Sequence, residues 1–249
     1  MMKQSLTWTS FGVLLLLAAL LLSVVFRVGE QNLWQLIAAN TEATEAPVII
    51  LDAGHGGEDS GAVGKNGVLE KDLNLSLSKT LAAMLRLAGY TVIESRTEDR
   101  LLCDDNVPKG HRKQTDLSNR LALTQKHPGC VLISIHMNTF PGADCVGTQV
   151  WYSEGHADSK AWASAVQNAV KEQLQPQNLR RIKASTSGIY LLKKAECPAI
   201  LIECGFLSTS VECERLCDPV YLGQLALVFF EAIAQKSPLP SCNATAAVI

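Results

Sequence analysis

The sequence predicts an α/β fold, with a mostly parallel central sheet flanked by helices and preceded by one N-terminal transmembrane helix. From Pro47 onward, short continuous apolar runs alternate with longer amphipathic ones, which is typical of strands buried on both faces by crossover helices. No charged residue interrupts residues 4–26, and a segment of this length and hydropathy can span a bilayer. Hydrophobic residues make up 47% of the 249 residues, which excludes a disordered chain.

The N-terminal apolar segment is expected to act as a signal-anchor over residues 1–27. Lys3 and the amino terminus precede it, and this charge bias favours an N-terminus in the cytoplasm and the rest of the chain outside. A cleaved signal peptide is the alternative, although the nearest small residues at a cleavage spacing are Ala43 and Ala46, well beyond the apolar run. A core helix of a soluble domain is disfavoured because no polar face interrupts the run.

The rest of the chain divides into a polar linker at residues 28–46, a folded domain at 47–236 and a flexible tail at 237–249. Strands are expected at 48–51, 91–95, 131–135, 147–152 and 199–203. Helices are expected at 71–87, 116–126, 159–174 and 219–235. The first of these helices carries its leucines on one stripe and stops before Gly89, a typical C-terminal cap. The third ends before Pro176, which cannot continue a helix.

Charge and cysteine content narrow the class of protein. Lys and Arg number 22 against 24 Asp and Glu, a net charge of −2, which is too even to attract phosphate backbones and excludes nucleic acid as a partner. The even number of cysteines would allow disulfides outside the cytoplasm. Cys130 and Cys204 lie in apolar runs, so buried thiols are the preferred interpretation over a disulfide framework.

The first expected strand runs into a glycine-rich turn at residues 52–57. Ligands bind at the carboxyl ends of strands in α/β sheets, and this turn places His55 there. The turn lacks the Gly-x-Gly-x-x-Gly order and the lysine of a phosphate-binding loop, so the sequence does not favour nucleotide binding. A single histidine in a turn is usually structural, so a functional role for His55 requires companions.

Three companions occur further along the chain. Glu70 stands where the first amphipathic helix begins, a position that the helix dipole favours for a carboxylate even without a functional role. His136 and Glu203 follow apolar strands at their carboxyl ends, and a buried carboxylate such as Glu203 needs a cation or a metal beside it. These side chains could converge on one zinc ion with an open position for water, which is chemistry suited to amide hydrolysis.

Four stretches then carry a family resemblance. They are Asp-Ala-Gly-His-Gly-Gly-Glu-Asp-Ser-Gly-Ala (52–62), Gly-Val-Leu-Glu-Lys-Asp (67–72), Ser-Ile-His-Met-Asn (134–138) and Ile-Glu-Cys-Gly-Phe-Leu-Ser (202–208). Together they resemble the zinc-dependent N-acetylmuramoyl-L-alanine amidases called the amidase-3 family, over almost all of the folded domain. Residues 115–120 and 189–195 look most like the spore-cortex members of that family.

The resemblance implies a phosphorylase/hydrolase-like α/β fold that holds one Zn²⁺ per chain through His55, Glu70 and His136. It implies Glu203 as the catalytic base and acid. The bond cut would join the lactyl group of N-acetylmuramic acid to the L-alanine of the stem peptide. In the spore-cortex branch, this cut prepares the sugar for conversion to muramic δ-lactam.

Further residues have open roles. Asn138 could bind substrate near the zinc, and Asp52 could orient a zinc ligand without contacting the metal itself. Turn and capping roles explain both residues equally well. Arg96 could neutralise a substrate carboxylate or close a structural salt bridge. Ala53, Met137 and Thr209 depart from the usual family pattern, and none of these departures removes a zinc ligand.

The expected partners are peptidoglycan as substrate, the membrane through the N-terminal helix, and an activator protein whose need the sequence leaves open. The enzyme would act on the extracytoplasmic face, which is the intermembrane space of the developing spore if the spore branch applies. Two rival functions remain: another zinc peptidase acting on wall peptides, and an inert membrane-tethered scaffold that binds peptidoglycan. The complete His, Glu, His, Glu set argues against the inert scaffold.

Overall fold

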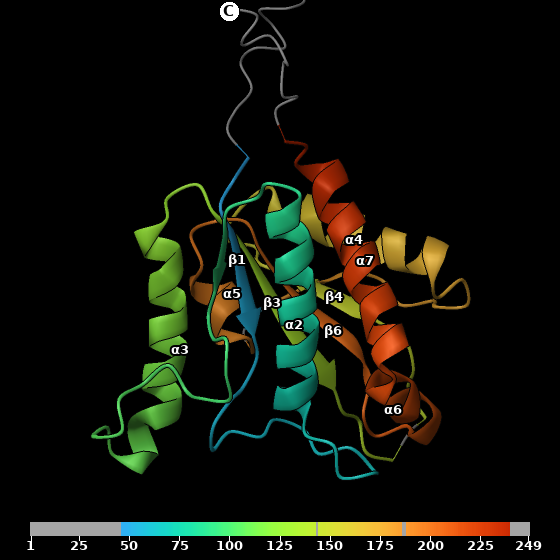
Figure 1. The fold of residues 1–249 in the computed structure, drawn as a ribbon, viewed down its shortest axis with the longest axis horizontal. Helices are drawn as coiled ribbons and strands as arrows, with labels where there is room; N and C mark the ends of the chain where they lie inside the picture. Colours follow the sequence, from blue (N-terminus) through green and yellow to red (C-terminus); the bar gives the residue numbers. More distant parts are fainter. Residues whose placement is uncertain (1–45, 143, 186–187, 240–249) are drawn as a thin grey trace, which may run out of the picture. The chain divides into compact units, whose positions relative to one another are not determined.

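The computed structural model describes residues 46–142, 144–185 and 188–239 (Figure 1). The expected anchor at 1–27, nearly all of the linker and most of the tail lie outside the described residues. Within the described ranges, no single helix combines the length and hydropathy of a membrane span, and one bent helix pair at 210–236 meets that test only when joined across an 80° break.

A six-stranded sheet forms the centre of the domain, in the order β2-β1-β3-β6-β4-β5. The strands are β1 (Ile49–Ala53), β2 (Val92–Glu94), β3 (Val131–Asn138), β4 (Gln149–Tyr152), β5 (Lys183–Ala184) and β6 (Ala199–Phe206). All neighbouring pairs are parallel except β4 with β6, which is antiparallel. The expected α/β fold with a mostly parallel sheet is therefore confirmed.

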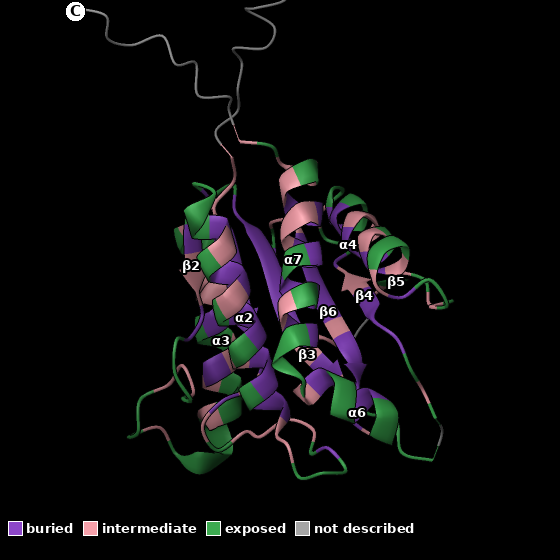
Figure 2. Cartoon of the chain, turned by 45° about the vertical axis from the view of Figure 1, so that its right-hand side comes forward, coloured by how far each residue is buried: buried purple, intermediate pink, exposed green. Residues whose placement is uncertain are grey.

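Helices cover both faces of this sheet (Figure 1). They are α2 (Glu70–Leu87), α3 (Lys109–Lys126), α4 (Ser159–Gln173), α5 (Tyr190–Lys194), α6 (Ser210–Cys217) and α7 (Pro219–Lys236). Buried side chains of α2, α4 and α7 join one hydrophobic cluster with the sheet. Those of α5, with the partly buried apolar side chains of α3, join a second cluster on the opposite face. Figure 2 shows the result: the central strands β3 and β6 are largely buried, while α2 and α7 keep an exposed outer side.

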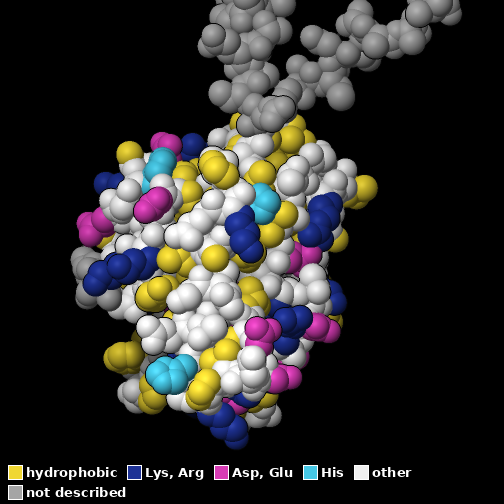
Figure 3. Space-filling view, turned by 90° about the vertical axis from the view of Figure 1, so that its left-hand side faces the viewer, with side chains coloured by type: hydrophobic (Ala, Val, Ile, Leu, Met, Phe, Trp, Pro, Cys, Tyr) yellow, Lys and Arg dark blue, Asp and Glu magenta, His cyan; other side chains and the backbone are white. Residues whose placement is uncertain are grey.

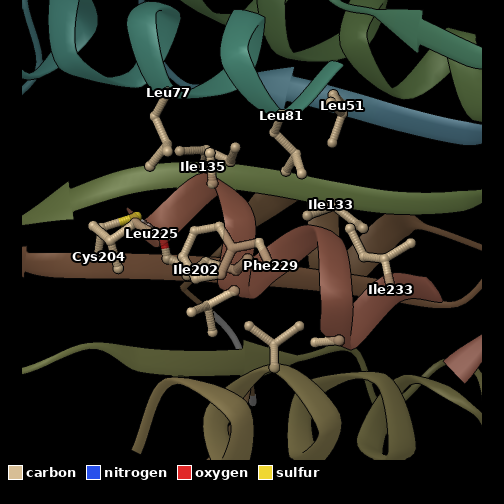
Figure 4. Close-up of a cluster of buried hydrophobic side chains, with 14 of the residues drawn as sticks. Leu51, Leu77, Leu81, Ile133, Ile135, Ile202, Cys204, Leu225, Phe229 and Ile233 are labelled. Atoms are coloured by element: carbon tan, nitrogen blue, oxygen red, sulfur yellow. Dashed lines mark hydrogen bonds between the residues drawn. The ribbon is translucent and has the colours of Figure 1, made fainter. Parts of the chain in front are cut away.

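Strict alternation along the central strands explains why both faces are apolar. Ile133 and Ile135 of β3 belong to the cluster under α2 and α7, whereas Leu132 belongs to the cluster under α3 and α5. Figure 4 shows the first cluster, in which Leu77 of α2 and Phe229 of α7 pack over β3 and β6. Cys204 is fully buried there, as a packed thiol. The seven described cysteines are all free thiols.

Several element boundaries differ from the sequence-based expectation. β3 and β6 continue to Asn138 and Phe206, because their backbone ladder extends beyond the apolar run that marks each strand. The α3 helix begins at Lys109 rather than at residue 116, since its first two turns are polar and show no apolar stripe. The short elements β5, α5 and α6 were not expected, because hydrophobic periodicity cannot be recognised in segments of so few residues.

Candidate metal centre

His55, Glu70 and His136 converge at the carboxyl end of the sheet. The turn after β1 carries His55, the first residue of α2 is Glu70, and β3 carries His136. The Nε2 atom of His55 lies 3.3 Å from Oε1 of Glu70, and Nδ1 of His136 lies 2.9 Å from the same oxygen. One donor atom from each residue lies within 4.8 Å of the others, so the cluster could hold a metal ion.

The turn that presents His55 has an unusual backbone. His55 has a φ of 62°, the only positive φ of a non-glycine residue among the described residues. This left-handed conformation costs on the order of 1 kcal/mol or more for a residue with a Cβ. Reciprocal backbone hydrogen bonds between Gly56 and Asp59 and a 2.7 Å hydrogen bond from Arg120 to the His55 carbonyl hold it in place.

Two glycines leave room for the converging side chains. A Cβ on Gly54 would lie 2.2 Å from Cε1 of His136. A Cβ on Gly61 would lie 2.5 Å from Oε2 of Glu70 and 2.7 Å from the His55 ring. The three donors are two imidazoles and a carboxylate, a set that zinc accepts. The residues present therefore fit a zinc ion in both chemistry and space.

Replacing Gly54 with alanine should weaken binding of Zn²⁺ by about tenfold or more, because the added methyl group displaces His136 from Glu70. Isothermal titration of the metal-depleted protein measures this loss. Gly110→Ala is the matched control, since a Cβ there meets nothing within 4 Å, and it should bind zinc as the unmodified protein does. Equal affinity in both variants would contradict the packing argument.

Glu70 is held as an anion. Burial alone would raise its pKa, but hydrogen bonds and charge from His136 and His55 outweigh burial and lower the pKa of Glu70 well below its usual range. The backbone N–H groups of Ala62 and Met137 donate to the two carboxylate oxygens at 2.7 Å and 3.0 Å. Its place in the first turn of α2 adds the favourable helix dipole. The carboxylate is therefore charged and fixed before any metal arrives.

Glu203 faces His136 across neighbouring strands, since the two residues pair in the β3–β6 register. The residue as a whole is partly exposed, but its Oε2 atom is buried and has no hydrogen-bond partner among the described residues. Burial raises the pKa of Glu203 to about 7, although the nearby His136 opposes the rise. An unpartnered carboxylate of this kind can exchange a proton near neutral pH.

Asp59 and Lys113 form an outer contact that the sequence did not single out. Nδ1 of His55 lies 3.0 Å from Oδ2 of Asp59, and Nζ of Lys113 lies 3.3 Å from the same oxygen. The His55 contact has the distance of an ion pair, and Nδ1 of His55 makes no hydrogen bond with a described residue. Asp59 and Glu70 raise the pKa of His55 against the opposing effect of burial. The sequence signal that could have indicated this contact is the spacing of four residues from His55 to Asp59 within one motif.

A buried ion-pair network lies directly beneath the His55 turn. Arg120 of α3 contacts Asp52 at 2.6 Å and Asp116 at 2.8 Å, and Ser134 donates to the second oxygen of Asp52 at 2.6 Å. Burial would raise the pKa of Asp52, but Arg120 and Ser134 lower it to about 2. Asp52 therefore acts on the His55 turn through Arg120, which donates to the carbonyl of His55.

Arg96 and Asn138 have local partners. Arg96 is buried and donates to the backbone carbonyls of Ala53, Gly54 and Lys71. This arrangement favours a structural role for Arg96, through carbonyl groups instead of the expected salt bridge. The side chain of Asn138 accepts a 2.8 Å hydrogen bond from the N–H of Thr139, which is a turn contact.

The surface outside the metal-binding cluster has a cavity and is mixed in charge. A cavity of about 420 Å³ lies at the ends of β3 and β6, lined by Val63, Lys65, Thr139, Pro141, Gly142, Asp144 and Ser208. On the face drawn in Figure 3, side chains of both signs are interspersed. An even distribution of this kind accords with the near-zero net charge.

Comparison with known proteins agrees with this geometry. The profile of the family described as N-acetylmuramoyl-L-alanine amidase (Amidase_3) matches residues 49–235. A germination-specific N-acetylmuramoyl-L-alanine amidase of Bacillus subtilis (strain 168) is 32% identical over 234 residues, which cover 93% of this chain and 95% of that protein.

Solved structures extend the match. The CwlD amidase from Clostridioides difficile, solved in complex with the GerS lipoprotein, is 34% identical with a TM-score of 0.72 and covers 76% of this chain and 97% of its own. An N-acetylmuramoyl-L-alanine amidase from Clostridium difficile 630 is 30% identical with a TM-score of 0.66, over 77% of this chain and 97% of its own. The chain therefore belongs to the N-acetylmuramoyl-L-alanine amidase family.

Proposed function

We propose that this amidase is zinc-dependent and cleaves the bond between the lactyl group of N-acetylmuramic acid and L-alanine in peptidoglycan, during spore-cortex maturation. The observation that carries the reaction is the convergence of His55, Glu70 and His136 beside the unpartnered carboxylate of Glu203. The spore role is supported by the similarity to a germination-specific amidase.

In this proposal His55, Glu70 and His136 hold the metal, and Glu203 handles the proton. Zn²⁺ at this position would act as a Lewis acid and make water nucleophilic at neutral pH by lowering its pKa toward ~7. Glu203 accepts the proton of the attacking water and delivers it to the alanine nitrogen as the amide bond breaks. Its unpartnered oxygen suits this exchange, because no protein donor competes for the proton. Asn138, two residues beyond His136, would contact the substrate beside the metal.

Asp59 should act by orienting His55, so Asp59→Asn should weaken Zn²⁺ binding by about 10–100-fold. The amide cannot provide the negative charge that favours the Nδ1 proton of His55 and leaves Nε2 free for the metal. Competition with a fluorescent zinc chelator measures the affinity directly. Glu58→Gln is the matched control, because Glu58 is the adjacent carboxylate and contacts Arg112 instead, at 3.4 Å. A normal zinc affinity for Asp59→Asn would remove Asp59 from this role.

Digestion of spore and vegetative peptidoglycan by the full-length protein tests the proposed reaction. Mass spectrometry should find sugars whose lactyl carboxyl group is free and stem peptides whose L-alanine amine is free. A chelator should stop the release, and added Zn²⁺ should restore it. Release of fragments cut between amino acids would instead identify a wall peptidase. Binding to peptidoglycan without any cleavage would identify an inert scaffold.

Anchoring and a partner complete the proposal. Residues 1–27 would tether the enzyme to the membrane, with the catalytic domain on the extracytoplasmic side. The CwlD amidase was solved in complex with a lipoprotein, and we propose a lipoprotein activator for this chain by analogy. Detergent-dependent extraction of the full-length protein from membranes tests the tether. A turnover that rises when a candidate lipoprotein is added tests the activator.

A further inference from the structure

Two cysteines lie just before the central pair of strands, β3 and β6. Leu132 of β3 pairs with Ala199 of β6, and the N–H of Leu132 donates to the carbonyl of Pro198 at 2.9 Å. Cys130 stands two residues before Leu132, and Cys197 stands two residues before Ala199. Both cysteines pack into the same hydrophobic cluster as Leu132 and Ala199, on one face of the sheet.

The packing agrees with this register. Cys130 is fully buried in the hydrophobic cluster under α3 and α5, and Cys197 packs against the same cluster. The two thiols interact directly, and each shifts the pKa of the other. Neighbouring strands lie about 4.8 Å apart, and disulfides join Cα atoms separated by about 4.4–6.8 Å. The direct interaction of the two thiols, two residues before the paired Leu132 and Ala199, therefore places them within reach of a disulfide.

The two thiols differ in access. Cys197 is partly exposed and lines a cavity of about 280 Å³, together with Thr124, Gln125, Pro128, Gly129, Lys194 and Glu196. Cys130 lies behind it and contacts the carbonyl of Thr124 through its Sγ at 3.7 Å. A reagent entering this cavity reaches Cys197 first, and only Cys197 can then reach Cys130.

We propose that Cys130 and Cys197 form a disulfide when the protein meets a small-molecule or protein disulfide. Cys197 attacks one sulfur of the oxidant, forms a mixed disulfide and releases the first thiol. Cys130 then attacks the sulfur of Cys197 and releases the second thiol. The protein loses two protons and two electrons, and the oxidant gains both as it becomes two thiols.

The cross-link would join the strands that carry the metal centre, at the opposite end of the sheet. His136 and Glu203 each lie six residues beyond their cysteine, which is about 20 Å along an extended strand. The bond should therefore leave the site intact and stabilise the paired strands. A loop of several tens of residues is closed, so the melting temperature should rise by about 5–10 °C. The inference depends on the proximity of the two thiols and on the access to Cys197, and it stands independently of the proposed reaction.

The test treats the full-length protein with oxidised glutathione, alkylates the remaining thiols after denaturation, and analyses tryptic peptides by mass spectrometry. Peptide 127–160 carries Cys130 and Cys145, and peptide 195–215 carries Cys197, Cys204 and Cys213. Fragmentation of the linked pair must therefore locate the bond. We expect one Cys130–Cys197 link with the loss of two hydrogens, together with the higher melting temperature.

Matched variants separate this pair from other thiols. Cys197→Ser should abolish both the link and the thermal shift, and Cys130→Ala provides a second variant that avoids a buried hydroxyl. Cys217→Ser should retain both effects, because Cys217 lies on α6, where its Sγ accepts a hydrogen bond from Asn66 at 3.3 Å. Alkylation of Cys130 and Cys197 after oxidation, or linkage of either to another cysteine, would overturn the proposal. Amidase activity is not needed for any of these readouts.

Discussion

Replacing Glu203 with glutamine should lower amidase turnover by about 10²–10⁴-fold while the protein still binds one zinc ion. Glutamine keeps the size of the side chain but can neither accept the proton of the attacking water nor return it to the leaving nitrogen. Zinc should remain bound because the three donors that converge are His55, Glu70 and His136. Loss of turnover with retained metal is the signature of a proton-transfer group, as opposed to a ligand.

Two measurements on the same sample make this result decisive. Turnover is followed by release of stem peptides, and metal content by elemental analysis. Glu214→Gln, on the exposed side of α6, is the control and should match the unmodified enzyme. Unchanged turnover in Glu203→Gln would remove Glu203 from catalysis. Loss of zinc together with turnover would instead make Glu203 part of the metal site.

Arg120→Met should destabilise the folded protein by about 3–5 kcal/mol, the largest stability effect that we expect from a single substitution. The guanidinium contacts Asp52 and Asp116, both of which are buried. Methionine fills much of the same volume but leaves these two carboxylates without a cation. The carbonyl of His55 also loses its donor, so zinc affinity should fall together with stability.

Chemical denaturation monitored by circular dichroism measures the free energy of unfolding. Arg100→Gln is the control, since Arg100 and Glu98 form an exposed pair at 3.7 Å and such pairs contribute about 0–1 kcal/mol. If Arg120→Met destabilised the protein no more than Arg100→Gln did, the buried network would not be important for folding.

The central strands and the candidate metal centre were predictable for the same reason. Apolar runs that are buried on both faces identify β1, β3 and β6, and the residues that follow each run must lie at one edge of a parallel sheet. His55, His136 and Glu203 stand at those places. Their proximity could thus be inferred from the sequence alone.

The supporting contacts were not predictable, because they join residues whose pairing depends on how helices dock. Arg120 lies on α3, and nothing in its local sequence indicates that it reaches under the turn of His55. Arg96 offers the converse case. A charged residue after a strand suggests a substrate contact. The guanidinium of Arg96 instead donates hydrogen bonds to backbone carbonyls of neighbouring segments. Such use depends on tertiary packing, which no local pattern encodes.

The pairing of His136 with Glu203 constrains how relatives of this protein can vary in length. Deleting one residue within β3 would rotate every later side chain to the opposite face of the sheet, so the imidazole would point under α2 and the carboxylate would lose its neighbour. Changes of length in the segment between β3 and β4 have no such effect, because that segment lies outside β3 and β6, the two strands that carry His136 and Glu203. Insertions and deletions should therefore be tolerated between β3 and β4 and eliminated by selection within β3 and within β6.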